Sequence, residues 1–334
     1  MSTRLPDIAD IERAAAALAP LIVRTPLLES PILNEALDAR ILFKIEALQR
    51  TGSFKFRGAW TAISRMSPGQ RQPGVVAFSS GNHAQGVAAA ARLHGIPAVI
   101  VMPSSAPRIK IRKTRQLGAE VVLYDSDNED RDAIGERLRD AHGYALVRPF
   151  DDFDVICGQG TVGLEIHEQL AALDVDADEL WCPCGGGGLI GGVSTALAAR
   201  RPRLRPFCVE PEHFDDTRRS LAAGERCPNA PGQRSICDAL LAPRPGELTF
   251  AINRERVAGG LVVTDAQVKG AMRWAFEELG IVLEPGGAVA VAAVLSGARP
   301  VRGRTIVAVC SGGNVDAERF ADCIMSTGNP SAKA

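Results

Sequence analysis

Lys55 lies between two aromatic residues, Phe54 and Phe56, in the run Thr-Gly-Ser-Phe-Lys-Phe-Arg-Gly. An ammonium among apolar groups and next to a second cation, here Arg57, has its charged form disfavoured, so more of it is the neutral, nucleophilic amine. Such a lysine can form a Schiff base. Lys44 has similar apolar neighbours, and a surface lysine lying along aromatic rings has the same local pattern. The neighbouring residues alone therefore do not identify the reactive lysine.

A run of four glycines is the second feature that could do chemistry. It comprises Gly185, Gly186, Gly187 and Gly188, after a predicted strand over residues 180–184 and before a predicted helix over residues 192–199. Successive glycines let the backbone turn several N–H groups inward, and the helix N-terminus adds partial positive charge. A tight turn without a ligand is the alternative, but four glycines in a row cost much unfolded-state entropy for a turn alone. The run therefore predicts a phosphate-binding loop.

The same glycines also contain a dinucleotide-binding spacing. Gly186, Gly188 and Gly191 follow the pattern Gly-x-Gly-x-x-Gly, and Glu210 ends a later predicted strand at a distance near that of a ribose-binding acid. A nicotinamide-binding oxidoreductase is therefore an alternative function. Against it, this pattern usually belongs to the first βαβ unit, and much of this chain precedes it.

Two further polar loops each follow a predicted strand. The first comprises Ser79, Ser80, Gly81, Asn82 and His83, after a strand over residues 75–78, and the second is Ser-Gly-Gly-Asn at residues 311–314, after a strand over residues 305–309. Hydroxyls, an amide and free N–H groups at a helix start can hold a carboxylate, and a well-placed hydroxyl can shuttle a proton. A simple N-cap explains any one of these residues, but it does not explain their grouping.

The composition of the whole chain is that of an ordinary globular protein. Of its 334 residues, 46% are hydrophobic and 23% are charged, and the net charge is -1. There is no basic excess to offset phosphates and no apolar stretch as long as a membrane span. We therefore expect no nucleic-acid partner, no membrane partner and a cytoplasmic location. The eight cysteines are spread along the chain, and we expect them to be reduced and buried.

Strand-like and helical runs alternate along the chain, which indicates parallel βαβ units. The first series has strands over residues 75–78, 98–102 and 121–124 and helices over residues 108–117 and 131–141, with a further helix that Gly95 ends. The second series has helices over residues 161–173, 192–199, 265–279 and 287–295, strands over residues 180–184, 206–209 and 305–309, and an irregular segment over residues 228–246. We predict a small domain, residues 74–149, and a large domain, residues 1–73 and 150–334. Because parallel sheets bind ligands at the carboxyl ends of their strands, a cleft between the domains would hold the polar loops.

Together with Gly-Gln-Gly-Thr at residues 158–161, the lysine segment, the glycine run and the polar loops resemble the serine/threonine dehydratase and serine racemase family. The resemblance runs in order over nearly the full chain. This family is a group of fold-type II pyridoxal phosphate enzymes. The resemblance implies an α/β fold of two open twisted parallel-sheet domains with flanking helices, like the β subunit of tryptophan synthase. It also implies pyridoxal 5'-phosphate in the large domain, a small amino-acid substrate and a homodimer.

The resemblance also implies a role for each candidate residue. Lys55 would hold the cofactor and, once released, would remove the α-proton, while Ser80 would be an acid/base group on the opposite face of the substrate. Gly185, Gly186, Gly187 and Gly188 would bind the cofactor phosphate, Asn82 the ring 3'-oxygen and Ser311 the pyridine nitrogen. Ser79, Ser80, Gly81, Asn82 and His83 would hold the substrate carboxylate, and Arg131 would contact a distal carboxylate.

The implied reaction is β-elimination from a β-hydroxy L-amino acid, such as L-threonine or L-serine, to a 2-oxo acid and ammonia. A neutral hydroxyl at the pyridine nitrogen, rather than an aspartate, makes the ring a weaker electron sink, which suits elimination better than transamination. A serine racemase and a 3-hydroxyaspartate ammonia-lyase are alternatives on the same scaffold. The nicotinamide-binding oxidoreductase is the remote alternative.

A cation site is the last implication. By resemblance to the racemase, Glu210, the carbonyl of Phe214 and Asp216 would coordinate a divalent ion, and such an all-oxygen set suits Mg²⁺ or Ca²⁺. Carboxylates that cap a helix beginning near Asp215 are an equally good interpretation of this segment.

Overall fold

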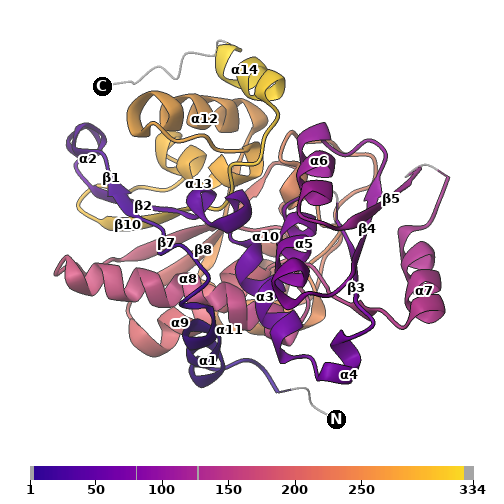
Figure 1. Ribbon diagram of the computed structural model, residues 1–334. Helices are drawn as coiled ribbons and strands as arrows, with labels where there is room; N and C mark the ends of the chain where they lie inside the picture. Colours follow the sequence, from indigo (N-terminus) through magenta and orange to yellow (C-terminus); the bar gives the residue numbers. More distant parts are fainter. Residues whose placement is uncertain (1–3, 80, 126–127, 327–334) are drawn as a thin grey trace.

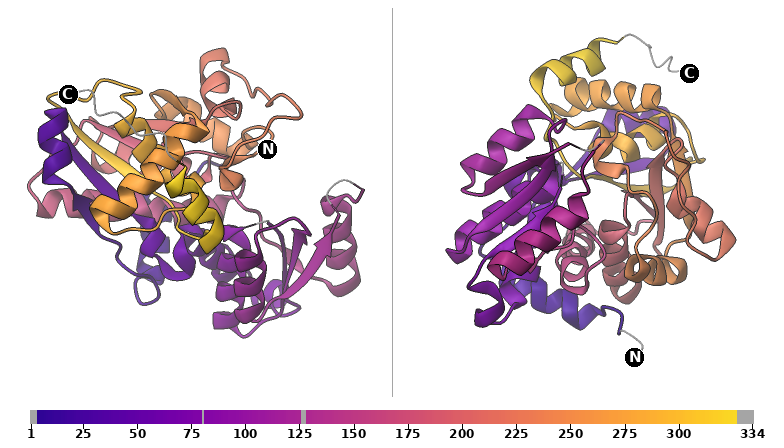
Figure 2. Two further views of the ribbon diagram at one scale, coloured as in Figure 1. Left: turned by 90° about the horizontal axis from the view of Figure 1, so that it is seen from above. Right: turned by 90° about the vertical axis from the view of Figure 1, so that its right-hand side faces the viewer.

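Two sheets of different size organise the chain, each covered by helices on both faces (Figure 1). The structure is a computed structural model that describes residues 4–79, 81–125 and 128–326. The two sheets lie in separate lobes, as Figure 2 shows from two directions. None of the helices in these ranges is long and apolar enough to cross a membrane.

The smaller sheet is wholly parallel and has the strand order β5-β4-β3-β6. Its strands are β3 (Val75–Phe78), β4 (Ala98–Pro103), β5 (Glu120–Tyr124) and β6 (Ala145–Leu146), and its helices are α5 (Asn82–His94), α6 (Arg108–Gln116) and α7 (Arg131–His142). Because side chains alternate along a strand, Val75 packs toward α5 while Val76 packs toward Ile134 of α7. Helix α5 ends where predicted, since Gly95 takes a left-handed φ of 65°.

The larger sheet has the strand order β1-β2-β10-β7-β8-β9. Its strands are β1 (Leu27–Glu29), β2 (Arg40–Ile45), β7 (Glu179–Pro183), β8 (Arg205–Pro211), β9 (Gly259–Val263) and β10 (Thr305–Cys310). The predicted parallel-sheet architecture is confirmed, and the sheet departs from it only at one edge, where β1 pairs antiparallel with β2. Residues 30–39 join these strands, and a parallel crossover needs a connection of about a dozen residues or more.

Four long helices cover the larger sheet. Helices α8 (Phe153–Ala172) and α9 (Gly188–Arg200) pack on one face, and α12 (Asp265–Leu279) and α13 (Pro285–Leu295) pack on the other. The predicted bounds of α12 are confirmed, but α8 begins at Phe153 rather than at residue 161. The side chain of Asp152 caps it by accepting N–H groups from Asp154 and Val155. Glycines in its first half lowered the predicted helicity, but they allow close packing: a Cβ at Gly158 would lie 2.4 Å from the Arg57 carbonyl oxygen.

Helix α3 (Lys55–Arg65) packs against both α5 and α8. Its Phe56 and Ile63 belong to the same buried cluster as Val75 and Val87 of the smaller lobe. The remaining helices are α1 (Ile8–Leu18), α2 (Pro31–Leu37), α4 (Pro68–Arg71), α10 (Asp216–Ala223), α11 (Glu247–Arg256) and α14 (Ala317–Met325), with 3-10 turns η1 (Glu46–Leu48), η2 (Arg50–Gly52) and η3 (Asp238–Leu240). The predicted division at residues 73/74 and 149/150 stays a prediction.

All eight cysteines are free thiols, and every one except the half-buried Cys227 is buried. The expectation of reduced, buried cysteines is therefore confirmed at seven positions. Several elements were not predicted from the sequence, namely strands β1, β2, β6 and β9 and helices α1, α2, α3, α4, α11 and α14.

Candidate active site

Lys55 is the first residue of α3 and points toward the segment that joins the two lobes. Its Nζ donates a hydrogen bond to the carbonyl oxygen of Pro149 at 2.7 Å and lies 5.2 Å from the centre of the Phe54 ring. Burial lowers the pKa of Lys55 to about 8, although the carboxylate of Glu284 acts in the opposite direction. Roughly a tenth of this side chain is therefore the neutral amine at pH 7, far more than for a lysine with an ordinary pKa.

The predicted contribution of Arg57 to this pKa is wrong. Arg57 is completely buried, and its guanidinium donates to Glu46 at 2.9 and 2.8 Å and to Glu165 at 2.7 Å. Residues two apart on a helix point to different sides, so Arg57 turns away from the Lys55 amine. Burial of the Lys55 amine itself is the cause of its lowered pKa.

Lys44 is distinguished from Lys55 by its partners. The Lys44 ammonium is completely buried and donates to Glu165 at 2.6 Å, to the Thr25 carbonyl at 2.8 Å and to Gln169 at 2.9 Å. It completes the ionic network around Arg57, so its three hydrogens are already used. Lys44 is a structural cation, and Lys55 is the lysine available for chemistry.

The glycine run connects β7 to α9 and has the features of an anion cradle. A Cβ at Gly186 would lie 2.3 Å from the Phe150 ring, and Gly187 has a φ of 90°. The Thr249 hydroxyl donates to the Gly186 carbonyl at 2.7 Å, which fixes the orientation of that carbonyl. Within the described chain, no side chain caps the N-terminus of α9. Its first N–H groups are therefore available to a phosphate.

The loop before α5 leaves a second helix start uncapped. The hydroxyl of Ser79 accepts from the Gly81 N–H at 3.1 Å, and α5 has no side-chain cap within the ranges given above. Ser79 is therefore not the simple N-cap of α5. Ser80 lies outside the described residues.

His83 does not carry charge to this loop. Its Nε2 lies 3.0 Å from the Val147 carbonyl oxygen, and its Nδ1 is buried with no hydrogen-bond partner among the described residues. Burial, together with the nearby Lys55, lowers the pKa of His83 to about 3. The imidazole is therefore neutral, and any carboxylate at this loop would be bound by N–H groups and hydroxyls.

Asn82 is fixed by two partners. Its side-chain nitrogen donates to Glu284, and its side-chain oxygen accepts from Asn314 at 2.9 Å. Ser311 follows β10 and is buried, and its carbonyl accepts the Phe54 N–H at 3.2 Å, which ties this loop to the lysine segment. The structure therefore gathers Lys55, Asn82 and Ser311 around one region.

A group of charged residues behind Asn82 was missed by sequence reasoning. Lys110 and Glu284 are both buried, and the Lys110 ammonium lies 2.8 Å from Asp238 and 3.2 Å from Glu284. The Lys113 ammonium donates to Asn314 at 2.9 Å. The sequence placed these lysines only in a basic run, and the one signal for Glu284 was its position before Pro285 at a helix start.

Arg131 is the first residue of α7, and its side chain lies outside the described part of the structure. Its predicted contact with a distal carboxylate stays a prediction.

Glu210 and Asp216 are brought together at the start of α10. Both carboxylate oxygens of Glu210 accept backbone N–H groups, from Thr217 at 2.9 Å and Arg218 at 2.8 Å, and Asp216 accepts from Asn229 at 2.7 Å. Burial raises the pKa of Glu210 to about 8 and that of Asp216 to about 6. Glu210 therefore caps the N-terminus of α10, as one of the two interpretations expects. The cation site formed by Glu210, the Phe214 carbonyl and Asp216 stays a prediction.

The fold and this arrangement define a pyridoxal phosphate enzyme. Residues 18–312 match the protein family described as "Pyridoxal-phosphate dependent enzyme", and the chain belongs to that family. The chain is 40% identical to the L-threo-3-hydroxyaspartate ammonia-lyase of Saccharomyces cerevisiae, over 96% of this chain and 97% of the relative.

Two solved structures extend the comparison. The threonine deaminase of T.th. is 42% identical with a TM-score of 0.88, covering 93% of this chain and 99% of that one. Maize serine racemase is 36% identical with a TM-score of 0.89, covering 95% and 96%. The two-lobed architecture is therefore the fold-type II arrangement of this family. The nicotinamide interpretation is set aside, because the family's cofactor is pyridoxal phosphate and Glu210 is buried against α10 rather than facing a ligand.

The residues present fit pyridoxal phosphate. The uncapped glycine loop at α9 suits a phosphate dianion, and the Lys55 amine, with its lowered pKa, suits an aldehyde. Side chains of α11 hold the loop in place, since Thr249 donates to the Gly186 carbonyl and Asn253 to the Gly187 carbonyl. The cradle is therefore formed in advance.

Proposed function

We propose that this protein catalyses β-elimination from a β-hydroxy L-amino acid, such as L-threonine or L-serine, giving a 2-oxo acid and ammonia. The observation that carries the proposal is the Lys55 amine, whose pKa is lowered to about 8 at a site that also holds the glycine cradle. Bound pyridoxal phosphate supplies an electron sink for the carbanion that forms when the α-proton leaves.

The chain's own groups divide the work. Lys55 holds the cofactor and then removes the α-proton, because its amine is partly neutral near pH 7. Gly185 to Gly188 hold the phosphate through backbone N–H groups. The N–H groups and hydroxyls of residues 79–83 bind the substrate α-carboxylate. Ser80 is the acid/base group proposed for the opposite face.

Asn82 and Ser311 orient the cofactor ring in this proposal. Asn82, locked by Glu284 and Asn314, would donate to the ring 3'-oxygen. Ser311 would contact the pyridine nitrogen, and its neutral hydroxyl favours elimination over transamination. We further propose a homodimer, and a cation bound by Glu210, the Phe214 carbonyl and Asp216.

Product analysis tests the function. The purified protein with cofactor is incubated with L-serine, L-threonine and L-threo-3-hydroxyaspartate, and 2-oxo acid and ammonia are measured together. Equal amounts of the two products from at least one substrate support the proposal. No product from any of them would overturn it. For the racemase alternative, chiral analysis would find D-serine accumulating faster than pyruvate.

A further inference from the structure

Residues 149–151 contact both halves of the cofactor site. The Pro149 carbonyl oxygen accepts from the Lys55 amine at 2.7 Å. The next residue, Phe150, packs on the glycine run so closely that a Cβ at Gly186 would lie 2.3 Å from its ring. This segment therefore lies between the reactive lysine and the phosphate cradle and contacts both.

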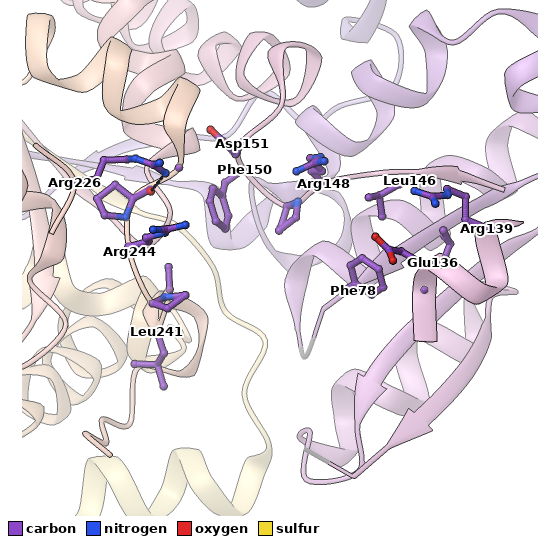
Figure 3. Close-up of a pocket in the computed structure, with 17 residues that line it drawn as sticks. Phe78, Glu136, Arg139, Leu146, Arg148, Phe150, Asp151, Arg226, Leu241 and Arg244 are labelled. Carbon is purple, nitrogen blue, oxygen red and sulfur yellow. Dashed lines mark hydrogen bonds between the residues drawn. The ribbon is translucent and has the colours of Figure 1, made fainter. Parts of the chain in front are cut away.

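Asp151, the third residue of the segment, fixes the start of helix α11. Its Oδ1 accepts the N–H groups of Leu248 at 2.9 Å and Thr249 at 3.1 Å, and its Oδ2 accepts the Glu247 N–H at 3.0 Å. A carboxylate suits this position because the first N–H groups of a helix lack partners and lie at the positive end of its dipole. In Figure 3, the Asp151 carboxylate and the Phe150 ring point to opposite sides of the segment. The segment therefore packs on the glycine run with one side chain and holds α11 with the next.

Helix α11 in turn holds two peptide groups of the glycine run. The buried Thr249 hydroxyl donates to the Gly186 carbonyl at 2.7 Å, and the buried Asn253 amide donates to the Gly187 carbonyl at 3.3 Å. In a trans peptide, the carbonyl and the following N–H point in opposite directions. Because both carbonyls point toward α11, the N–H groups of Gly187 and Gly188 point away from it. The two hydrogen bonds therefore fix the direction in which the cradle presents its donors.

Thr249 is the residue at which these contacts meet. Its N–H is held by Asp151, and its hydroxyl holds the Gly186 carbonyl. A short path of direct contacts therefore runs from Pro149 through Asp151 and Thr249 to the cradle. The position of the cradle depends on α11, and the position of α11 depends on the segment that binds the lysine.

We propose that residues 149–151 and helix α11 form a brace that sets the position of the phosphate cradle relative to the Lys55 amine, and that Asp151 and Thr249 are its positioning residues. Pyridoxal phosphate has an aldehyde for the amine and a phosphate for the cradle, so its affinity depends on the separation of these two sites. An aldehyde without a phosphate has no such requirement. The inference concerns cofactor binding and holds for any amino-acid substrate.

The brace can be altered without opening the hydrophobic core. Asp151 is half-buried, and together with Phe150 and Gly246 it lines a cavity of about 640 Å³ (Figure 3). Truncation of Asp151 therefore removes a helix cap and leaves no void in the core. Thr249 is completely buried, and valine replaces its hydroxyl with a methyl group of similar size. That change leaves the Gly186 carbonyl without its donor.

Binding of two aldehydes by the cofactor-free protein tests the brace. Affinities for pyridoxal phosphate and for pyridoxal, which has the same aldehyde and no phosphate, are measured by absorbance titration. We expect Thr249→Val and Asp151→Ala each to lower the affinity for pyridoxal phosphate about 10-fold and to change the affinity for pyridoxal less than about 2-fold. Thr249→Ser keeps the hydroxyl and should retain the wild-type ratio of the two affinities.

The double variant tests whether the two residues act through one path. Since Asp151 acts on the cradle through α11 and Thr249, Asp151→Ala should add little to Thr249→Val. The affinity of the double variant for pyridoxal phosphate should lie within about 2-fold of that of the weaker single variant.

Two matched controls separate the brace from general stability. Asp152→Ala removes a helix cap at the neighbouring residue, because Asp152 caps α8. Thr195→Val removes a buried hydroxyl of α9 that donates to the Gly191 carbonyl at 2.8 Å. Both variants should leave the ratio of the two affinities within about 2-fold of the wild-type value. Thermal melting of each cofactor-free variant shows whether it is folded.

Several outcomes would overturn the inference. They are unchanged affinity for pyridoxal phosphate, equal loss of affinity for both aldehydes, losses that multiply in the double variant, or a control that changes the ratio as much as the brace variants do. A loss in Thr249→Ser as large as in Thr249→Val would also overturn it. If Asp151→Ala does not fold, the comparison of Thr249→Val with Thr249→Ser decides alone. Product formation by the wild type tests the proposed elimination separately.

Discussion

The Lys55 amine donates a hydrogen bond to the carbonyl oxygen of Pro149 at 2.7 Å, and so links the first turn of α3 to the segment that returns from the smaller lobe. The next residue, Phe150, packs against the glycine loop. The amine is thus positioned by the same short segment that contacts the phosphate cradle. A group held in this way is ready to meet an aldehyde without rearrangement of the backbone.

Replacing Lys55 with alanine should abolish elimination while leaving the fold intact. Since a positioned base alone contributes about 100-fold or more to the rate, turnover should fall by at least that factor. Borohydride reduction should fix the chromophore on the Lys55 peptide in the wild type and on no peptide in the variant. Lys269→Ala, on α12, is the control that should behave as wild type. Robust turnover by Lys55→Ala would contradict the assignment.

The reactivity of Lys55 should follow its lowered pKa. In the cofactor-free protein, acylation of Lys55 measured by mass spectrometry should rise through a pH of about 8, because only the amine reacts and the amine forms as pH increases. In urea the midpoint should return toward 10.5. Glu284→Gln should move the folded midpoint lower, since the carboxylate raises the Lys55 pKa. An unchanged midpoint on unfolding would refute this account.

The ionic network around Arg57 should be essential for stability. Arg57→Met removes the cation between Glu46 and Glu165 and leaves two buried carboxylates, so the free energy of unfolding should drop by about 3–5 kcal/mol. Urea denaturation measures it. Arg24→Met breaks an exposed pair with Glu168 and should cost less than about 1 kcal/mol. If the free energy of unfolding fell equally in the two variants, burial of the network would not be the source of its stabilising effect.

Gly186→Ala should weaken cofactor binding. The new Cβ would lie 2.3 Å from the Phe150 ring, and overpacking of this kind should lower affinity for pyridoxal phosphate about 10-fold to 100-fold in an absorbance titration. Gly69→Ala is the control, because nothing lies within 4 Å of its added Cβ. If Phe150→Ala restores affinity to the Gly186→Ala protein, the clash with the ring is the cause. Unaltered affinity in Gly186→Ala would argue against this loop as the cradle.

The predicted cation site can be tested through stability. Asp216 has one buried carboxylate oxygen without a hydrogen-bond partner in the described chain, which a cation could engage. Adding Ca²⁺ or Mg²⁺ should therefore raise the thermal midpoint, with a size that grows with cation concentration. Asp216→Asn should remove the effect. If neither cation changes the thermal midpoint, the cation site is wrong and these carboxylates serve only to cap helix α10.

The loops that carry chemistry could be predicted because their signals are local. A glycine run or a polar group at a strand end reports its own backbone requirement, so residues 79–83, 185–188 and 311–314 could be recognised from the sequence. The predicted bounds of α12 were right for the same reason, since Thr264 caps its start and Gly280 takes a left-handed φ at its end.

What sequence could not provide was the partner of each charge. Lys44 and Lys55 have similar neighbours in sequence. Only the tertiary contacts show that the Lys44 ammonium is already bound by Glu165 and Gln169. Arg57 was assigned to Lys55 by proximity in sequence, whereas the helix turns it toward Glu46. Glu284 lies far from Asn82 and Lys110 in the chain, so no local pattern could connect them.

Helix α3 has a consequence for the modularity of the protein. Its Phe56 and Ile63 share one core with β3 and α5, so the helix that presents Lys55 is built into the smaller lobe although it precedes that lobe in sequence. Excising residues 74–149, or exchanging them with those of a relative, would expose this apolar surface and disturb the lysine at once. The two lobes therefore have to be inherited together, and recombination between homologues should preserve activity only where a crossover keeps α3 with α5.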